Sequence, residues 1–179
     1  MKLKIKVKRL NKTIALPEIT EKGDWIDLRC SRDLIMTAPQ AGVLKRTVIK
    51  GKEEAQRNVS FDFKYIPLGV AIQLPKGFEA VVLARSSTPE KFGIITANSE
   101  GVIDNTYCGE NDEWKYPALA LRNTKLFEGD RICQFRIQLS QKATFWQKLK
   151  WLFSNGVKIV EVDHLDNTNR GGFGSTGKI

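Results

Sequence analysis

The C-terminal end of the chain carries its densest group of residues suited to a phosphate ligand. It reads RGGFGSTG from Arg170 to Gly177. Glycines let the backbone approach a ligand and point N–H groups at phosphate oxygens, while arginine and hydroxyl groups add donors. Phe173 stands alone among the glycines, where an aromatic ring can stack on a flat ring. The plain alternative is an unstructured, glycine-rich end.

Two further segments offer groups for phosphate and metal. Arg85, Ser86 and Ser87 follow an apolar run, so an arginine fork and two hydroxyls would stand where a strand ends. Asp27 lies in the segment GDWIDL, and its carboxylate could meet hydrated Mg²⁺, which prefers carboxylate and phosphate oxygens. Taken alone, each segment is also compatible with an ordinary surface turn.

Residues 98–109, NSEGVIDNTYCG, are predicted to form a hairpin with Gly101 in or near its turn. Asp104 follows two β-branched residues, so a strand would hold its carboxylate rigidly. A carboxylate held in this way can orient and deprotonate a water molecule. Tyr107, three residues further on, could pack flat against a sugar.

A fourth segment, GDRICQFRI at residues 129–137, alternates apolar residues with Gln134 and Arg136, as expected of a strand with two unlike faces. Zinc chemistry is not indicated, because His164 is the only histidine and the cysteines are scattered. The chain also has no Walker-type loop and no GxSxG segment with a histidine partner.

A folded scaffold must position these groups, and the sequence predicts an all-β fold for it. Short apolar or alternating runs separated by turn residues are typical of a barrel or sandwich. The predicted strands include residues 3–10, 65–74, 80–84, 93–96, 118–121 and 132–139. Residues 1–166 are predicted to form one domain, and residues 167–179 a flexible tail.

One segment, from Thr144 to Ser154, is predicted to be a short amphipathic helix. Its apolar residues Trp146, Leu149, Leu152 and Phe153 recur at helical spacing. In one interpretation this stripe packs on the protein's own assembly, which we favour because so short a helix needs tertiary support. In the other, the stripe is exposed and contacts a protein partner or an anionic membrane.

Composition limits the possibilities. The 179 residues are 41% hydrophobic and 27% charged, which suits a single folded domain. The net charge of +9 favours a polyanionic partner, either nucleic acid or a polyphosphate. No apolar run is long enough to span a membrane. Cys30, Cys108 and Cys133 are scattered, which indicates free thiols and a cytoplasmic location.

Taken in order, GDWIDL, ARSS, NSEGVIDNTY, GDRICQF and RGGFGSTG resemble the five motifs of the trimeric dUTPase family, over residues 23–177. The resemblance implies a jelly-roll-like β-barrel of the β-clip type, assembled as a homotrimer with active sites shared between subunits. It implies Mg²⁺-dependent hydrolysis of dUTP to dUMP and pyrophosphate, which lowers dUTP and supplies dUMP for thymidylate synthesis. No nucleic acid is an obligatory partner.

The resemblance also implies roles for the matching residues. Asp104 would activate the attacking water, Tyr107 would lie under the deoxyribose, and Asp27 would contact a water on Mg²⁺, which the substrate phosphates mainly hold. The other implied substrate contacts are Arg85, Ser86, Ser87, Asn98, Gly101, Val102, Ile103, Gln134, Arg170, Phe173, Gly174, Ser175 and Thr176. The last five belong to the tail that would close over the site. The chain departs from the family in a shorter Arg170–Phe173 spacing and a longer connection at residues 144–154.

Three other functions stay open at this point. Nucleic-acid binding is one of them, and it rests only on the net charge. The dCTP deaminases resemble this family in fold, but they transfer protons through a glutamate in a Leu-Glu-Leu-x-Asn-like strand. The matching residues 119–123 have Ala120 in that place, and alanine cannot transfer a proton. A regulatory role, in which a protein partner contacts residues 144–154, is compatible with catalysis.

Overall fold

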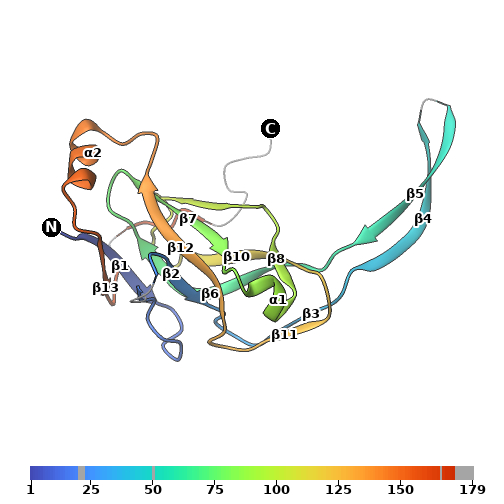
Figure 1. Cartoon of the computed structure of the whole chain (residues 1–179), viewed down its shortest axis with the longest axis horizontal. Coiled ribbons are helices and arrows are strands. Elements are labelled where there is room, and N and C mark those ends of the chain that lie inside the picture. The colour runs from blue at the N-terminus through green and yellow to red at the C-terminus, as the bar shows by residue number, and fades with distance from the viewer. Residues whose placement is uncertain (20–22, 50, 166, 172–179) are drawn as a thin grey trace.

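The computed structural model describes residues 1–19, 23–49, 51–165 and 167–171 (Figure 1). Strands dominate it, which confirms the predicted all-β class. The elements in chain order are β1 (Leu3–Arg9), β2 (Ile26–Arg29), β3 (Leu34–Met36), β4 (Gln40–Ile49), β5 (Lys52–Ser60), β6 (Phe63–Gln73), β7 (Phe78–Ala84), α1 (Thr88–Phe92), β8 (Ile94–Thr96), β9 (Gly101–Asp104), β10 (Glu113–Ala120), β11 (Thr124–Leu126), β12 (Arg131–Leu139), α2 (Phe145–Leu152) and β13 (Val157–Glu161).

Two sheets form the body of the molecule. One has the strand order β13-β1-β6-β10-β8 and the other β2-β12-β7-β9. Their neighbouring strands are antiparallel except for β1 and β13, which are parallel. Consecutive strands such as β6 and β7, or β8 and β9, belong to different sheets. The chain therefore crosses repeatedly between the two layers, as it does in jelly-roll-like folds.

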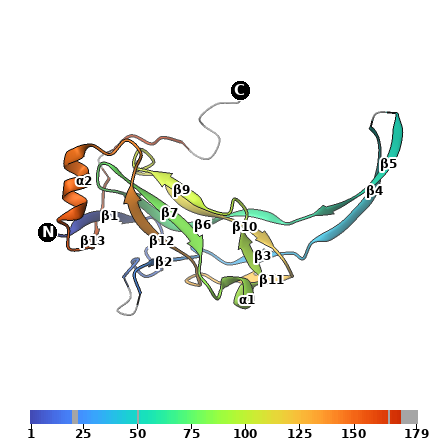
Figure 2. The same cartoon turned by 45° about the horizontal axis from the view of Figure 1, so that its top comes forward.

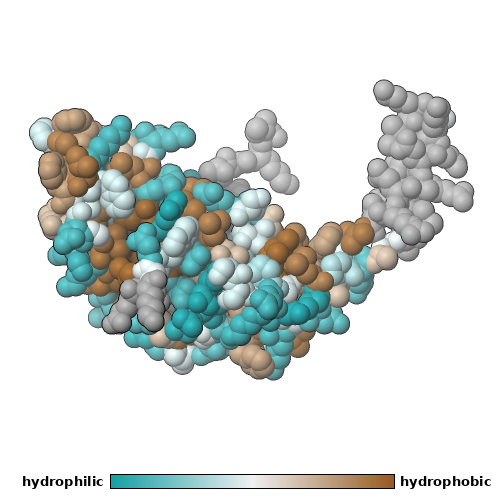
Figure 3. All heavy atoms as spheres, in the orientation of Figure 1, coloured by the Kyte–Doolittle hydropathy of each residue, from teal (hydrophilic) through white to brown (hydrophobic). Residues whose placement is uncertain are grey.

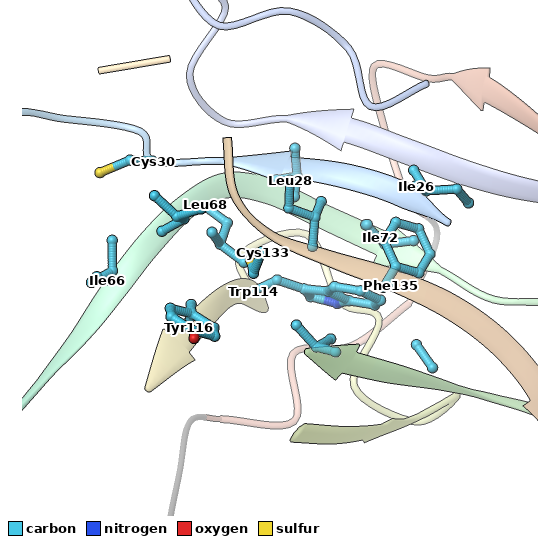
Figure 4. Packing of buried hydrophobic residues seen from close by; sticks show 14 of the residues in the cluster. Ile26, Leu28, Cys30, Ile66, Leu68, Ile72, Trp114, Tyr116, Cys133 and Phe135 are labelled. Atoms are coloured by element: carbon cyan, nitrogen blue, oxygen red, sulfur yellow. The ribbon is translucent and has the colours of Figure 1, made fainter. Parts of the chain in front are cut away.

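The hydrophobic core lies between these sheets (Figure 4). Trp114 of β10 and Phe135 of β12 are fully buried, and their rings meet edge to face with centroids 5.1 Å apart. Tyr116, also on β10, shares a 2.8 Å hydrogen bond between its hydroxyl and that of Thr96. Burial alternates along β12, as the sequence predicts, so Gln134 stands on the face of the strand opposite Phe135.

The three cysteines are free, as predicted, and all three are buried. Burial raises the pKa of the Cys133 thiol well above its ordinary value. Because a thiol must ionise to act as a nucleophile, Cys133 serves packing and not chemistry.

The predicted hairpin over residues 98–109 is wrong. β8 pairs with β10 in one sheet, whereas β9 pairs with β7 in the other. Residues 97–100 cross between the sheets, and Ser99 adopts a φ of 61° there, which is uncommon for a residue other than glycine. Gly101 begins β9 opposite Val82 and directly follows the turn, so it lies near the turn as predicted. The turn is where the sequence predicts it, but packing between the sheets selects the partner of each flanking strand.

Residues 40–60 form a feature that the sequence pattern does not predict. β4 and β5 pair as a long antiparallel hairpin that projects from the body (Figures 1 and 2). Within the described residues, neither strand joins another sheet. The hairpin sequence mixes apolar and charged residues, so it lacks the clear apolar run of a core strand.

α2 confirms the predicted helix and shows why it begins at this point. The Thr144 side chain accepts a hydrogen bond from the Gln147 backbone N–H, and the Gln147 side chain accepts one from the Thr144 N–H at 2.8 Å. This reciprocal capping box satisfies two N–H groups that the helix leaves without partners.

Among the described residues, none of the helices has the length and apolarity needed to cross a membrane.

The side chain that packs α2 on the body differs from the predicted stripe. Trp151 contacts Phe78, with ring centroids 5.3 Å apart. Trp146, Leu152 and Phe153 of the predicted stripe are exposed. Within a single chain, therefore, most of the stripe does not contribute to a core.

We expect Trp151→Ala to lower the free energy of unfolding by about 2 kcal/mol, less than for a fully buried tryptophan because Trp151 is 37% exposed. The matched variant is Trp146→Ala on the same helix, where the side chain is 75% exposed. It should change stability by no more than about 0.5 kcal/mol. Urea unfolding of both variants measures the difference. Equal losses would mean that Trp146 is buried in the assembled protein.

Candidate functional site

Asp27 lies at the centre of one polar group. It is buried on β2, directly opposite Gln134 of β12, so the two side chains share one face of the sheet. Its Oδ1 atom is 2.8 Å from Nε of Arg85, and its Oδ2 atom is 3.1 Å from Nη1 of Arg131. One carboxylate thereby holds two guanidinium groups close together. Paired guanidinium groups suit a ligand with several anionic oxygens.

Ser86 and Ser87 follow Arg85 at the junction between β7 and α1. Both serines are exposed. The next residue, Thr88, is fully buried and donates its hydroxyl to the carbonyl oxygen of Ile132 at 2.8 Å. This bond fixes the end of the loop that carries the two serines to β12.

Asp104 is the last residue of β9 and the centre of a second group. Its Oδ1 atom accepts hydrogen bonds from the Thr106 backbone N–H, at 2.8 Å, and from the Thr106 hydroxyl. Its Oδ2 atom is 2.5 Å from Nη1 of Arg170. Burial raises the pKa of Asp104, but the hydrogen bonds from Thr106 and Arg170 outweigh it and bring the pKa below its ordinary value. The carboxylate is therefore ionised at neutral pH, as a proton acceptor must be.

The residues around Asp104 form an exposed strand edge and a fixed ring. β9 is an edge strand, paired with β7 on one side within the described residues, and Asn98 is exposed in the loop that leads into it. Tyr107 is half-buried, and its hydroxyl donates to the carbonyl oxygen of Glu113 at 3.0 Å. Burial raises the pKa of Tyr107, so the hydroxyl stays protonated and keeps this bond. This hydrogen bond holds the ring of Tyr107, which follows Asp104 by three residues, in a fixed position.

The first part of the tail lies against the loop that follows β9. The Arg170 N–H donates to Asp112 Oδ2 at 3.0 Å, and the Asn111 N–H donates to Asn169 Oδ1 at 2.8 Å. A Cβ atom at Gly109 would lie 2.5 Å from the Asn169 Cα, so only glycine permits this approach. The predicted contacts Phe173, Gly174, Ser175 and Thr176 lie outside the described residues.

The Asp27 group and the Asp104 group stand at opposite ends of β7. Asp104 is paired with Glu79, near the start of β7, whereas Arg85 directly follows its last residue. Arg85 lies six positions after Glu79 along an extended strand, which is a distance of roughly 20 Å. One chain therefore does not bring Asp104 together with Arg85 and the serines.

A cleft of about 730 Å³ opens beside Asp104. The charged side chains on its border are those of Lys76, Glu79, Lys142 and Arg170, together with Asp104 itself. Asp27, Arg85 and Gln134 do not border it. The cleft thus belongs to the Asp104 group alone.

A metal ion has little to bind directly in the described part of the chain. No group of three or more His, Cys, Asp or Glu side chains lies close enough there to hold one. Both carboxylate oxygens of Asp27 are already engaged by guanidinium groups. Among the described residues, Asp27 therefore has no carboxylate oxygen free of an ion pair.

Three residues of these groups have no role in the sequence prediction. Arg131 forms half of the guanidinium pair, Thr106 orients Asp104, and Asp112 binds the tail backbone. Arg131 and Thr106 lie within predicted polar segments, but both are common in turns. Nothing in the sequence indicates that Asp112 faces residues 169–170, because that contact is tertiary.

No protein-family model matches the chain. Several curated proteins are similar to it in sequence. The chain is 44% identical to the SPbeta prophage-derived deoxyuridine 5'-triphosphate nucleotidohydrolase of Bacillus subtilis, with 98% of this chain and 99% of that protein covered. It is 32% identical to the deoxyuridine 5'-triphosphate nucleotidohydrolase of Hydrogenobaculum sp., also with 98% and 99% covered.

Solved structures agree in fold. The dUTPase of Streptococcus mutans superposes with a TM-score of 0.57 at 19% identity, over 75% of this chain and 96% of that one. The dUTPase from phage phi11 of S. aureus gives a TM-score of 0.58 at 14% identity, over 79% and 93%. Since the full-length relatives and the shared fold point the same way, this chain belongs to the dUTPase family.

Proposed function

We propose that this protein hydrolyses dUTP to dUMP and pyrophosphate, by attack on the α-phosphorus of a water molecule that Asp104 activates. The observation that carries the proposal is the ionised carboxylate of Asp104, oriented by Thr106 on a rigid strand end, in a chain of the dUTPase family. A carboxylate held in this way can position a water molecule in line with the phosphorus and accept its proton. The pyrophosphate then leaves.

The nucleoside would bind along β9. The outer edge of this strand presents backbone N–H and C=O groups of residues 101–104 to the uracil edge, and Asn98 lies next to it. Tyr107, fixed through Glu113, would lie flat under the deoxyribose and leave no room for a 2′-hydroxyl. Base and sugar would thus be selected by rigid groups, which reject mismatched substrates more strongly than apolar pockets do.

The triphosphate would bind the Asp27 group. Arg85, Ser86, Ser87 and Gln134 are the proposed contacts, and the ion pair of Arg131 with Asp27 adds a second guanidinium to them. A bound Mg²⁺ would offset part of the roughly four negative charges of the triphosphate. Asp27 acts here by holding the two arginines. Its expected contact with a metal-bound water stays a prediction.

Each active site would combine two or more chains of a homotrimer. Asp104 and Arg85 of the same chain lie at opposite ends of β7, which favours contact of one dUTP molecule with these residues from different chains. A symmetric assembly can place the β9 edge of one chain against the Asp27 group of the next. The tail would then close over the site with Arg170 and Phe173–Thr176, and exclude water. The reaction would lower dUTP and supply dUMP for thymidylate synthesis.

Deamination of dCTP is the nearest enzymatic alternative, and the structure disfavours it. Ala120, which replaces the deaminase glutamate, is fully buried at the end of β10 and pairs with Ile94. A core alanine offers no proton-transfer group.

Incubation with each nucleotide in the presence of Mg²⁺, followed by measurement of pyrophosphate, tests the proposed reaction. We expect dUTP to be cleaved with kcat/KM higher by on the order of 10² or more than for dTTP, dCTP and UTP. Comparable turnover of dCTP or UTP would contradict the proposal, and release of ammonia from dCTP would support the alternative.

Mixed assemblies test the sharing of the site. Asp104→Asn should lower kcat by about 10²–10⁴ through loss of the base, and Arg85→Gln should also be nearly inactive. If the two residues act from different chains, co-refolding the variants in equal amounts restores sites that contain both native residues. Random mixing should recover about one quarter of wild-type activity. If both residues acted from one chain, every site would lack one of them and activity would stay absent.

The role of Asp27 is tested by Asp27→Asn. Loss of its charge should release Arg85 and Arg131 and lower kcat/KM by about 10–100-fold, because misplacement by about 1 Å has effects of that size. Asp27→Glu keeps the charge and should recover part of the loss. The matched control is Asp33→Asn, which removes an exposed carboxylate 3.8 Å from Lys125. An Asp27→Asn variant with normal kinetics would rule out the positioning role.

A further inference from the structure

α2 presents its apolar residues to solvent and not to the body. Phe145, Trp146, Leu152 and Phe153 are 66–75% exposed. In Figure 3 brown, apolar atoms gather in the region where Figure 1 places α2, beside paler and hydrophilic ones. Contiguous exposed apolar patches generally mark contact sites. We call this surface the α2 face.

The position of each side chain around the helix shows that this exposure is systematic. At about 100° per residue, Leu152, Phe145, Leu149, Phe153 and Trp146 follow one another over an arc of roughly 120°. The opposite side carries Gln147 and Trp151. A Cβ at Gly77 would lie 2.3 Å from Gln147 Oε1, and Trp151 packs on Phe78. The helix is thus attached to the body by its narrower side, with its wide apolar arc outward.

Lysines border the α2 face on both sides. By the same geometry, Lys148 and Lys150 lie at its two edges, and both are exposed. Residues 131–160 contain no aspartate or glutamate. The start of the chain lies close to the end of α2, because the Asn155 N–H donates to the Met1 carbonyl oxygen at 3.0 Å. The exposed Lys2 and Lys4 therefore add positive charge nearby. The surroundings of the apolar arc are therefore basic.

We propose that the α2 face docks on an anionic lipid surface, with the helix lying in the plane of the interface. Helices that bind in this way have an apolar arc with aromatic residues and a lysine-rich polar side. Tryptophan rings favour the interfacial layer, and lysine stems let the ammonium groups reach the headgroups. Gln147, on the side away from the lipid, lines the cleft beside Asp104, so docking leaves this side of the helix uncovered.

Charge disfavours the other occupants of this surface. In a symmetric contact with a second copy, the lysine borders of both copies would face one another, and like charges repel. Protein–protein contacts are enriched in arginine and depleted in lysine. Residues 137–169 contain four lysines and no arginine. An anionic lipid layer complements both the apolar arc and its lysine border.

The first experiment measures sedimentation of the full-length protein with vesicles. We expect binding to phosphatidylcholine vesicles that contain about 30% phosphatidylglycerol, weak binding to phosphatidylcholine alone, and release by about 0.5 M salt. Trp146→Ser with Phe153→Ser should lower the binding constant at least about 10-fold. Ile35→Ser with Phe127→Ser is the matched control, since these side chains are 64% and 52% exposed elsewhere.

A second pair of variants isolates the charge. Lys148→Glu with Lys150→Glu should also lower binding at least about 10-fold, and these surface changes preserve folding. Lys12→Glu with Lys125→Glu changes the net charge equally at positions away from α2 and should bind like wild type. Pyrophosphate release from dUTP, assayed below the melting temperature, should be unchanged in all four variants.

Three results would overturn the proposal. The first is no binding of wild-type protein to the anionic vesicles at low salt. The second is equal binding by the α2 variants and their controls. The third is a change of oligomeric state in the Trp146→Ser, Phe153→Ser variant, measured by light scattering, because it would assign the α2 face to a contact between copies.

Discussion

β7 is hydrogen-bonded along both of its edges, to β12 on one side and to β9 on the other, and the chemistry of the protein depends on this pairing. The register with β9 places Asp104 beside Glu79, while the end of β7 carries Arg85 into contact with Asp27. A one-residue slip in either ladder would turn the apolar side chains of β7 away from the core, so the register is tightly specified. The distance between the two polar groups is therefore set by the core.

The two aspartates of these groups serve different purposes because their surroundings differ. Asp27 is buried and engages a guanidinium with each oxygen, so its charge is used to hold cations in place. Asp104 is more exposed: Thr106 binds its Oδ1 atom, and only its Oδ2 atom contacts an arginine, Arg170. A substrate phosphate can displace the Asp104 carboxylate from Arg170 more easily than the buried Asp27 carboxylate from its two arginines, since ion pairs of exposed carboxylates are weak. The proposed base is accordingly the carboxylate that substrate binding can free.

α2 and the β4–β5 hairpin are elements that the core does not require. The hairpin makes its sheet contacts within itself, and α2 is attached through Trp151 and Gln147. An isolated two-stranded hairpin is only marginally stable in water, and a short helix needs tertiary support. Both elements leave surface that a single chain does not cover, so their residues are suited to contacts beyond the chain.

The sequence by itself determined the all-β class, the α2 helix, the buried face of β12 and the polar segments that hold the site. These features follow from local periodicity and from residue chemistry, which a single sequence displays directly. The residues of the five motifs also identified the family before any contact was known.

Tertiary structure alone decided which segments meet. Residues 98–109 look like a hairpin locally, but β8 and β9 join different sheets because each side of the core needs its own edge strand. Asp27 binds Arg85, 58 positions further along the chain, and Arg131, 104 positions further, and no local pattern encodes these contacts. The outward apolar arc of α2 is a similar case. Amphipathic spacing fixes that a helix has an apolar side, but which side meets the body depends on where Phe78 and Gly77 receive it.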